Sequence, residues 1–167
     1  MSMIGEYARL TPTELDRAVK DPGWAQDFVG ELIDAQADEP GASRPRCLDT
    51  SQAWDTLGLL LRRIDFPIDI VHGEEEIPDA DDWGYGPPRY LTPEQVRAAS
   101  SALAATPSDV LTRGVTAAEL LRADLYPRIA QDEVEEWLKY VVHHYQALVP
   151  FFETAAREGH AMMVWLD

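Results

Sequence analysis

The sequence lacks the features that mark secreted and membrane-spanning proteins. Cys47 is the only cysteine, so no disulfide can form within the chain. No apolar run approaches the roughly 20 residues that a membrane-spanning helix needs. Glu6 and Arg9 interrupt the apolar residues at the start of the chain before the core of a signal peptide could form. We therefore expect a cytoplasmic protein without a membrane partner.

Positive charge is also scarce in this chain. Lys and Arg total 14 against 30 Asp and Glu, which gives a formal net charge of −16. Such a surface repels phosphate backbones, and no stripe of Lys or Arg with interleaved aromatics offsets the repulsion. We therefore expect no nucleic-acid partner. The acidity is explained either by solubility alone or by binding to a basic protein partner.

Motifs for catalysis and cofactor binding are missing as well. The chain contains no G-x-S-x-G, no H-E-x-x-H and no Gly-rich phosphate loop. Gly84-Tyr85-Gly86 lacks the flanking strand and helix of a dinucleotide fingerprint. His143 and His144 are adjacent, so they project about 100° apart around a helix and cannot share a metal ion within one turn. We expect no catalytic residue, no cofactor and no metal site.

Three further features have both a structural and a functional interpretation. Arg44 and Arg46 would lower the pKa of the nearby Cys47 thiol and make it reactive, although a plain loop cysteine explains the position as well. His160 follows the glycine that should stop a helix, where a histidine complements the helix C-terminus. An acidic cluster without EF-hand spacing predicts a solvated loop or a docking surface for a basic partner rather than a calcium site. It comprises Glu74, Glu75, Glu76, Asp79, Asp81 and Asp82.

What the chain does contain is the composition of an ordinary globular protein. Hydrophobic residues make up 46% and charged residues 26% of its 167 positions. That length is typical of one domain, and no linker divides the chain, so we expect a single domain over residues 1–167.

Capping signals define most of the predicted helices. Thr11-Pro12 and Thr92-Pro93 each place a Thr at the N-cap and a Pro at the first helical position, and Glu14 or Gln95 completes a capping box three residues after the Thr. The predicted helices span about 12–20, 25–36, 50–63, 93–105, 107–112, 117–123 and 132–158. Polar loops are expected at 37–46 and 73–88.

The apolar stripe of the last helix sets expectations for individual side chains. Its three- and four-residue spacing predicts that Trp137 and Leu148 are buried. His143 falls on the opposite face and should be exposed, whereas His144 lies at the edge of the stripe and should pack against it.

Strands are expected mainly at the two ends of the chain. Ala161 to Leu166 are apolar at every position, which suits a strand covered on both faces. Met3–Leu10 and Pro88–Leu91 are two further predicted strands, while Phe66–Val71 fits either a strand or a turn of helix. The pattern predicts an α+β fold. We expect a small sheet of about three to four strands that includes both chain termini, with helices packed largely on one side.

A polar and aromatic set provides candidate binding residues. Glycines beside Tyr85 permit positive φ and close approach of the backbone, and aromatic side chains with an arginine are common in ligand pockets. The alternative is that Trp54 and Tyr126 belong to the core. Arg89 is expected to be partly buried and paired with a carboxylate. The candidates are Trp54, Asp55, His72, Tyr85, Arg89 and Tyr126.

Several short motifs, in order along nearly the whole chain, resemble those of a known family. They are Met3-Ile4-Gly5, Leu48-Asp49 followed by Ala53-Trp54-Asp55 and Leu57, Gly84-Tyr85-Gly86-Pro87 with Arg89-Tyr90-Leu91-Thr92-Pro93, Tyr126-Pro127, and Gly159 before an apolar terminal strand. Together they resemble the YfbM-like proteins. The resemblance implies a compact α+β fold and a bacterial cytoplasmic setting. It supplies no established activity, cofactor or catalytic residue.

Two functional hypotheses follow from the sequence. The first is a non-catalytic binding or interaction protein for a basic protein partner, in the way that immunity proteins neutralise toxins. The second is a sensor or enzyme for an unidentified small molecule, with a pocket around Trp54, His72, Tyr85 and Arg89. The guanidinium of Arg89 would then hold an anionic group, because its planar fork suits carboxylate or phosphate.

Overall fold

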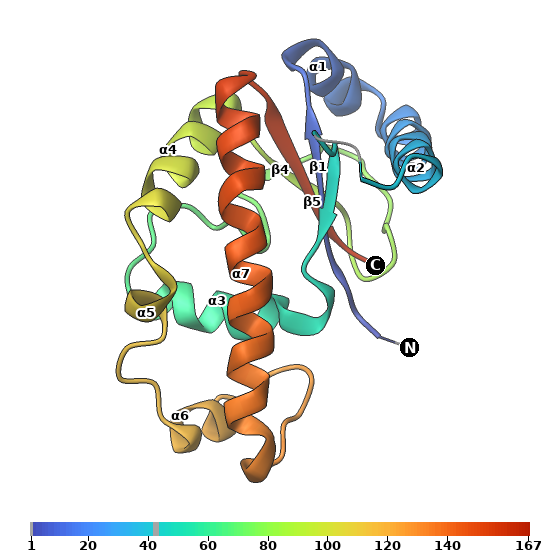
Figure 1. Cartoon of the computed structure of the whole chain (residues 1–167). Helices are drawn as coiled ribbons and strands as arrows, with labels where there is room; N and C mark the ends of the chain where they lie inside the picture. Colours follow the sequence, from blue (N-terminus) through green and yellow to red (C-terminus); the bar gives the residue numbers. More distant parts are fainter. Residues whose placement is uncertain (1, 42–43) are drawn as a thin grey trace.

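The computed structural model describes residues 2–41 and 44–167 and has the predicted α+β class (Figure 1). Its five strands pair antiparallel throughout in the order β2-β1-β5-β4-β3. They are β1 (Gly5–Leu10), β2 (Cys47–Asp49), β3 (Glu75–Glu76), β4 (Arg89–Leu91) and β5 (Ala161–Leu166). The sheet therefore includes a strand from each end of the chain, as predicted, with β5 at its centre.

The sheet contains more strands than the sequence predicts. The additional strands β2 and β3 have three and two residues, which is too short to show an alternating pattern. Phe66–Val71 forms neither of the expected alternatives but a series of turns.

The helices match the predicted ranges closely. They are α1 (Pro12–Lys20), α2 (Pro22–Asp38), α3 (Trp54–Arg63), α4 (Pro93–Ala104), α5 (Ser108–Leu111), α6 (Ala117–Arg122) and α7 (Val134–Arg157), with short 3-10 helices η1 (Ser51–Ala53) and η2 (Gln131–Glu133). Both predicted capping boxes form: the Thr11 hydroxyl accepts from Glu14 N, and the Thr92 hydroxyl accepts from Gln95 N. Helix α2 extends to Asp38, within the predicted loop 37–46, of which residues 42–43 lie outside the described part of the chain.

Two hydrophobic clusters form on opposite faces of the sheet. On one face, α3, α4, α5 and α7 pack against Tyr7, Leu91 and Met162. On the other face, α1 and α2 pack against Leu10 and Met163. The larger group of helices thus covers one face, and α1 and α2 cover part of the other (Figure 1).

Strand β5 is buried on both faces, as its sequence predicts. Residues 161–165 are each 7% exposed or less. Met162 and Val164 belong to the cluster of α3, α4 and α7, whereas Met163 and Trp165 belong to the cluster of α1 and α2. Residues 162–165 therefore alternate between the two cores, as a strand between two layers requires.

Helix α7 follows the predicted phase with one exception. Leu148 is fully buried and His143 is exposed, as expected. Trp137 is only half-buried, contrary to the prediction, because its outer side faces a hollow at the start of the helix. Among the described residues, no helix combines the length and the apolar character that crossing a membrane requires.

Candidate functional site

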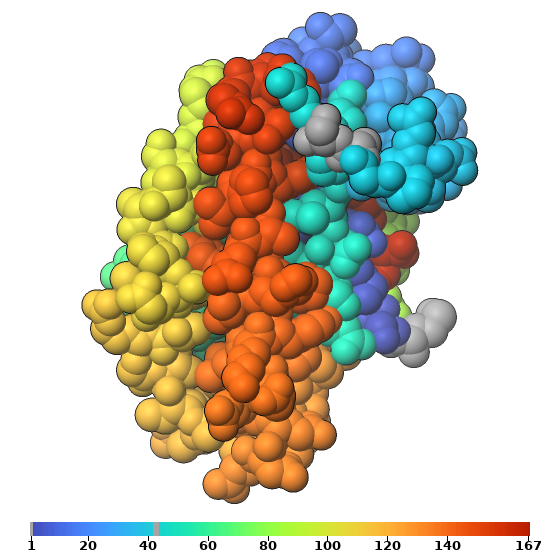
Figure 2. Space-filling model, in the orientation of Figure 1, coloured from blue at the N-terminus to red at the C-terminus, as the bar shows by residue number. Residues whose placement is uncertain are grey.

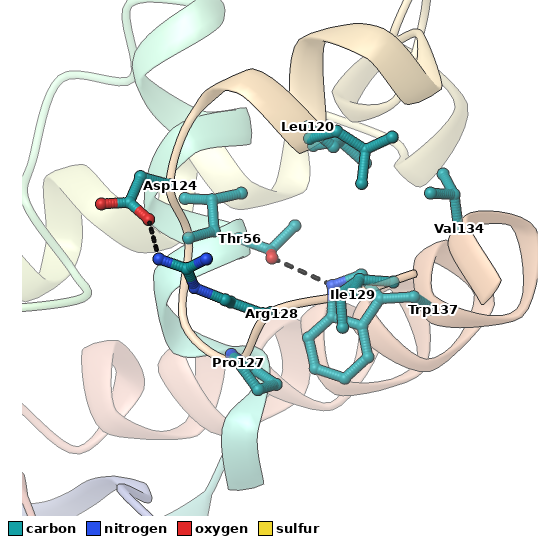
Figure 3. A pocket seen from close by; sticks show the side chains of 10 residues that line it. Thr56, Leu120, Asp124, Pro127, Arg128, Ile129, Val134 and Trp137 are labelled. Atoms are coloured by element: carbon teal, nitrogen blue, oxygen red, sulfur yellow. Dashed lines mark hydrogen bonds and ion pairs between the residues drawn. The ribbon is translucent and has the colours of Figure 1, made fainter. Parts of the chain in front are cut away.

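The main candidate site is a cavity of about 170 Å³ between α3, α6 and the first turn of α7, which we call the α6–α7 pocket (Figure 3). Leu120, Leu121 and Val134 form much of its apolar wall. The remaining wall comes from the segment 124–129, which joins α6 to η2 and includes Pro127. The pocket lies in the lobe that projects away from α1 and α2, at the bottom of Figure 2.

Two residues at the start of α3 hold the 124–129 segment in place. The Asp55 carboxylate accepts a hydrogen bond from the Tyr126 backbone N–H at 2.9 Å. The Trp54 ring stacks on the Tyr126 ring with a centroid separation of 5.8 Å. The next residue along α3, Thr56, and the residue after Tyr126, Pro127, both line the pocket. The α3 start therefore fixes the wall without contributing Trp54 or Asp55 to the lining.

A buried hydroxyl forms the polar part of the pocket. Thr56 is 1% exposed, which makes it the most buried residue of the lining. Its Oγ1 accepts a hydrogen bond from Trp137 Nε1 at 3.0 Å (Figure 3). Because an indole N–H only donates, this bond leaves the hydroxyl proton of Thr56 available.

The rim of the pocket is more exposed than its walls. Asp124 and Arg128 form an ion pair of 3.4 Å with side chains that are 84% and 91% exposed. Leu121 is 41% exposed, and it is one of three large hydrophobic side chains classed as exposed among the described residues. An apolar pocket with an exposed leucine at its edge is a typical binding surface.

Acidic side chains outnumber basic ones in the segment that builds the pocket. Between residues 117 and 139 the acids are Glu119, Asp124, Asp132, Glu133, Glu135 and Glu136, and the bases are Arg122, Arg128 and Lys139. Several of these charges neutralise one another, since Lys139 lies 3.0 Å from Glu136 and Arg128 pairs with Asp124. The excess charge of this segment is negative, as is the net charge of the whole molecule.

Four of the six residues singled out from the sequence come together. Trp54 contacts Tyr126 by stacking and His72 edge to face, with a centroid distance of 6.1 Å to the latter. The N-terminal segment closes the group, because Met3 N donates to Tyr126 Oη and Trp54 Nε1 donates to Met3 O. With Asp55 they form a packed cluster beside the pocket. Trp54 is buried, as the core interpretation of this residue requires.

Arg89 lies apart from this cluster, on β4. Its Nη1 is 3.0 Å from Glu76 Oε1, and the side chain is 33% exposed, which confirms the expected partial burial and carboxylate partner. Nε and Nη2 donate to the carbonyls of Gly73 and Glu74. The Glu76 carboxylate is 83% exposed, so removal of Arg89 would not strand a buried charge.

Tyr85 is also separate from the aromatic cluster. Its side chain is 40% exposed, and its backbone N–H donates to Leu166 O beside the end of β5. The preceding Gly84 has φ +109°, and a Cβ there would lie 2.9 Å from Asp167 Cα. Glycine is therefore needed for the loop to pass the C-terminal residue.

The acidic cluster takes part in local hydrogen bonds. Glu74 accepts from Asp69 N, Glu75 accepts from Gln95 Nε2, and Glu76 pairs with Arg89. No group of three or more His, Cys, Asp or Glu side chains within residues 2–41 and 44–167 is arranged to hold a metal ion. Glu75 and Glu76 thus tie the 73–88 loop to α4 and β4, while Glu74 ties it to the preceding turns.

Both sequence interpretations of Cys47 need correction. It lies in β2 rather than in a loop and is 6% exposed. Burial, and next the nearby Glu6 carboxylate, raise the pKa of its thiol to about 11, against the weaker opposing effect of Arg46. The thiol is therefore protonated near neutral pH and is not an activated nucleophile.

The interpretation of His160 as a cationic complement to the helix C-terminus is also wrong. His160 is buried, and its Nδ1 lies 3.0 Å from Arg9 Nη1. Arginine can only donate, so Nδ1 is the acceptor and carries no proton. Burial and the charges of Arg9 and Arg46 lower the pKa of His160. Burial also lowers the pKa of His144, which is half-buried as predicted.

Sequence patterns miss the pocket residues themselves. Leu120 and Val134 read as ordinary apolar positions of two helices, and nothing local shows that the helices leave a gap between them. The available signal was Tyr126-Pro127, an aromatic–proline step within a segment of irregular structure, because its Pro127 lines the pocket.

Comparison with known proteins agrees with this architecture. The crystal structure of YfbM from Escherichia coli, a protein of unknown function, superposes with a TM-score of 0.69 at 16% sequence identity. The match covers 98% of this chain and 99% of YfbM, so the two proteins share the fold over their whole lengths. No curated protein sequence matches the chain. The sequence model described as Domain of unknown function (DUF1877) matches residues 1–165, and the chain therefore belongs to that family.

Proposed function

We propose that the protein is a non-catalytic binding domain of the cytoplasm, which takes an apolar side chain of a basic protein partner into the α6–α7 pocket. The observation that carries the proposal is the pocket, a solvent-accessible cavity of about 170 Å³ that is lined mostly by residues with apolar side chains. An apolar cavity of about 150 Å³ holds a benzene-sized group. The volume therefore suits one side chain rather than a nucleotide or a larger cofactor.

Charge favours a basic partner over a neutral or acidic one. The net charge of −16 attracts a positively charged protein over several ångströms, and the lobe that carries the pocket has the same sign. Apolar anchors provide binding energy at the centre of an interface, while charges around the rim govern the association rate. The pocket and its acidic surroundings supply these two components.

The rival hypothesis of an anion sensor around Arg89 has less support. Nε, Nη1 and Nη2 of Arg89 already donate to Gly73 O, Glu76 and Glu74 O. A ligand carboxylate or phosphate would have to share the guanidinium with the negatively charged Glu76. Among the described residues, neither Tyr85 nor Arg89 forms a side-chain hydrogen bond or an aromatic pair with Trp54 or Tyr126, as a shared pocket would require.

The test uses a matched pair of surface substitutions. Leu121→Gln adds a polar group at the pocket rim, whereas Ile33→Gln makes the same kind of change on α2, where Ile33 is 38% exposed. Neither changes the charge. A partner is first captured from cell lysate, identified and purified, and its dissociation constant is then measured by titration calorimetry at low and high salt.

We expect Leu121→Gln to weaken binding about tenfold, because part of the apolar contact is lost. Ile33→Gln should leave binding unchanged. Raising the salt concentration should weaken the binding of the partner to the parent protein and to both variants. Equal binding by the three proteins would exclude the pocket as the site. An acidic partner, or binding that salt leaves unaffected, would contradict the electrostatic part of the proposal.

A further inference from the structure

A second cavity, of about 280 Å³, forms an open groove between α2 and the β2 edge of the sheet. Ile33, Gln36 and Ala37 of α2 line one side, and Glu6 of β1 and Asp49 of β2 line the other. We call it the α2–β2 groove. It shares no lining residue with the α6–α7 pocket, so what it binds is independent of the proposed function.

Two carboxylates of the groove lie directly opposite each other in the sheet. Glu6 and Asp49 are paired residues of β1 and β2. The neighbouring pair is hydrogen-bonded, since Thr50 N donates to Gly5 O, and bonded and non-bonded pairs alternate in an antiparallel ladder. Glu6 and Asp49 therefore form a non-bonded pair, in which facing side chains come closest. Like charges at such a pair destabilise a sheet.

Glu6 also lacks a partner of opposite charge. It is half-buried, and burial, with the carboxylates of Asp49 and Asp167, raises its pKa to about 7. No hydrogen bond or cation among the described residues opposes these effects. The other half-buried glutamates in the described part of the chain each have a donor: Glu14 has Arg46, Glu75 has Gln95 and Glu119 has Arg63. Such an exception to the usual pairing is expected at a functional site.

We propose that the α2–β2 groove binds a free primary alkylammonium ion, with its nitrogen between the carboxylates of Glu6 and Asp49 and its alkyl chain against α2. An ammonium group has three donors and no acceptor, so one ion can bond to both carboxylates. Asp49 Oδ1 accepts from Ser51 N, which holds this side chain in place and leaves Oδ2 for the ligand. On α2, Ile33 is 38% exposed and would be covered by the alkyl chain.

Other cations fit the groove less well. A calcium ion takes six to eight oxygen ligands, and no group of three or more potential metal ligands in the described residues is arranged to hold a metal ion. A single lysine side chain from a protein would fill only part of the groove, whose volume approaches the roughly 300 Å³ of the smallest typical ligand sites. A free amine therefore suits both the charge and the volume.

The charge of Glu6 makes the binding depend on pH. With a pKa of about 7, Glu6 is mostly protonated at pH 5 and mostly ionised at pH 8, and a cation favours the ionised form. Facing it are the carboxylates of Asp49 and Asp167 and the protonated thiol of Cys47, while α2 lines the groove with uncharged residues only. His144 of α7 interacts with the charge of Asp49, and its protonation in acid would weaken binding in the same direction. Affinity should therefore rise with pH.

Four probes separate the contributions of charge and alkyl chain. They are n-pentylamine, which is protonated at pH 8 as lysine is, 1-pentanol, ammonium chloride and Nα-acetyl-lysine amide. Pentanol has the chain without the charge, and ammonium has the charge without the chain. Binding is followed by NMR at constant ionic strength through the side-chain amide of Gln36 and the backbone amide of Cys47, which are hydrogen-bonded to each other and line the groove.

At pH 8 we expect pentylammonium to bind about fivefold more tightly than ammonium or pentanol, and more tightly than the capped lysine. Its affinity should fall about fivefold at pH 5. Glu6→Gln should weaken binding to a similar extent at pH 8 and remove most of the pH dependence. Asp49→Asn, which keeps the acceptor for Ser51 N, should also weaken it.

The matched control is Glu31→Gln, which removes the same charge from an exposed position of α2 outside the groove. It should leave the affinity for pentylammonium unchanged. Equal losses from Glu31→Gln and Glu6→Gln would attribute the binding to net charge and overturn the proposal.

The remaining outcomes also decide the matter. Equal affinity for pentylammonium and ammonium would show that the groove only attracts counter-ions and would overturn an alkylammonium site. Tighter binding of the capped lysine would assign the groove to a protein side chain and overturn a free amine. If pentylammonium shifts neither the Gln36 nor the Cys47 signal at millimolar concentration, the site does not exist. None of these results affects the proposal for the α6–α7 pocket.

Discussion

Buried polar groups are hydrogen-bonded to different extents at the two ends of the molecule. Near α1, Arg9 is 4% exposed, and its guanidinium donates to Pro45 O, Arg44 O and His160 Nδ1 at 2.9–3.0 Å. In the opposite lobe, near α6, Thr56 is also buried, but its hydroxyl keeps an unused proton beside a cavity (Figure 3). A buried group that is fully bonded fixes the chain, whereas one that is partly bonded beside a cavity keeps hydrogen-bonding capacity for water or a ligand.

The largest expected effect comes from removing Arg9. Arg9→Ala should lower the free energy of unfolding by about 3 kcal/mol, because it removes a buried stem and leaves two carbonyls and His160 without their donor. Arg128→Ala, the same change in the pocket lobe, should cost under about 0.5 kcal/mol, since its ion pair is solvent-exposed. Urea unfolding followed by circular dichroism measures both. Similar losses would contradict the contrast between the two ends.

A second comparison lies within α7, which runs from the pocket to the packed end. Leu148→Ala should cost about 3 kcal/mol, because Leu148 is fully buried in the larger core. Trp137→Ala should cost less, about 2 kcal/mol, despite the larger side chain, because one side of Trp137 already faces the cavity. His143→Ala, an exposed control, should cost under about 0.5 kcal/mol. A larger loss for Trp137 than for Leu148 would show that the pocket is closed in solution.

The sequence predicts the features that depend on neighbouring residues. Capping boxes at Thr11 and Thr92 need only the residue three positions later, and both form. The all-apolar run Ala161–Leu166 can only be a covered strand in a chain this acidic, and it lies at the centre of the sheet. The fold class follows from these local signals.

Features that depend on distant residues are less predictable. Arg9 and His160 are 151 positions apart, so neither position suggests the other. Strands β2 and β3 form only because the longer strands β1 and β4 offer them free edges. The side-chain amide of Gln36 then bonds to both the backbone N–H and the backbone carbonyl of Cys47 in β2. Trp137 has the spacing of a core residue, but spacing does not show whether a neighbouring helix covers it.

Glu6 provides a smaller effect, with a pH dependence of its own. Burial, together with the carboxylates of Asp49 and Asp167, raises the pKa of Glu6 to about 7 from 4.5. Its folded-state pKa lies above the unfolded value, so its stabilising contribution is full below about pH 4.5 and is lost as the pH rises through 7. Glu6→Gln should therefore add on the order of 1 kcal/mol at pH 8 and little at pH 4.5.

Thermal unfolding of parent and Glu6→Gln across this range tests the assignment, with Glu39→Gln as an exposed control that removes the same charge. An equal gain from the control would attribute the effect to net charge rather than to the burial of Glu6 on β1 beside Asp49 of β2. A loss of stability at pH 8 would contradict the raised pKa altogether.

The smallest expected effect concerns His160, whose pKa moves in the opposite direction. Burial and the charges of Arg9 and Arg46 lower it, against the weaker opposing effects of Glu158 and Glu14. Its folded-state pKa lies below the unfolded value of about 6.5, so its contribution is present above pH 6.5 and is lost as the pH falls. Protonation would place a cation against Arg9 Nη1 and end the hydrogen bond at Nδ1.

The titration of Glu6 changes the stability in the opposite direction over the same pH range. The measurement on His160 is therefore made in the Glu6→Gln background. There, His160→Asn keeps an acceptor for Arg9 without titrating and should flatten the fall in stability below pH 6.5. Identical pH profiles with and without His160→Asn would show that the Arg9–His160 bond is not what acid disrupts.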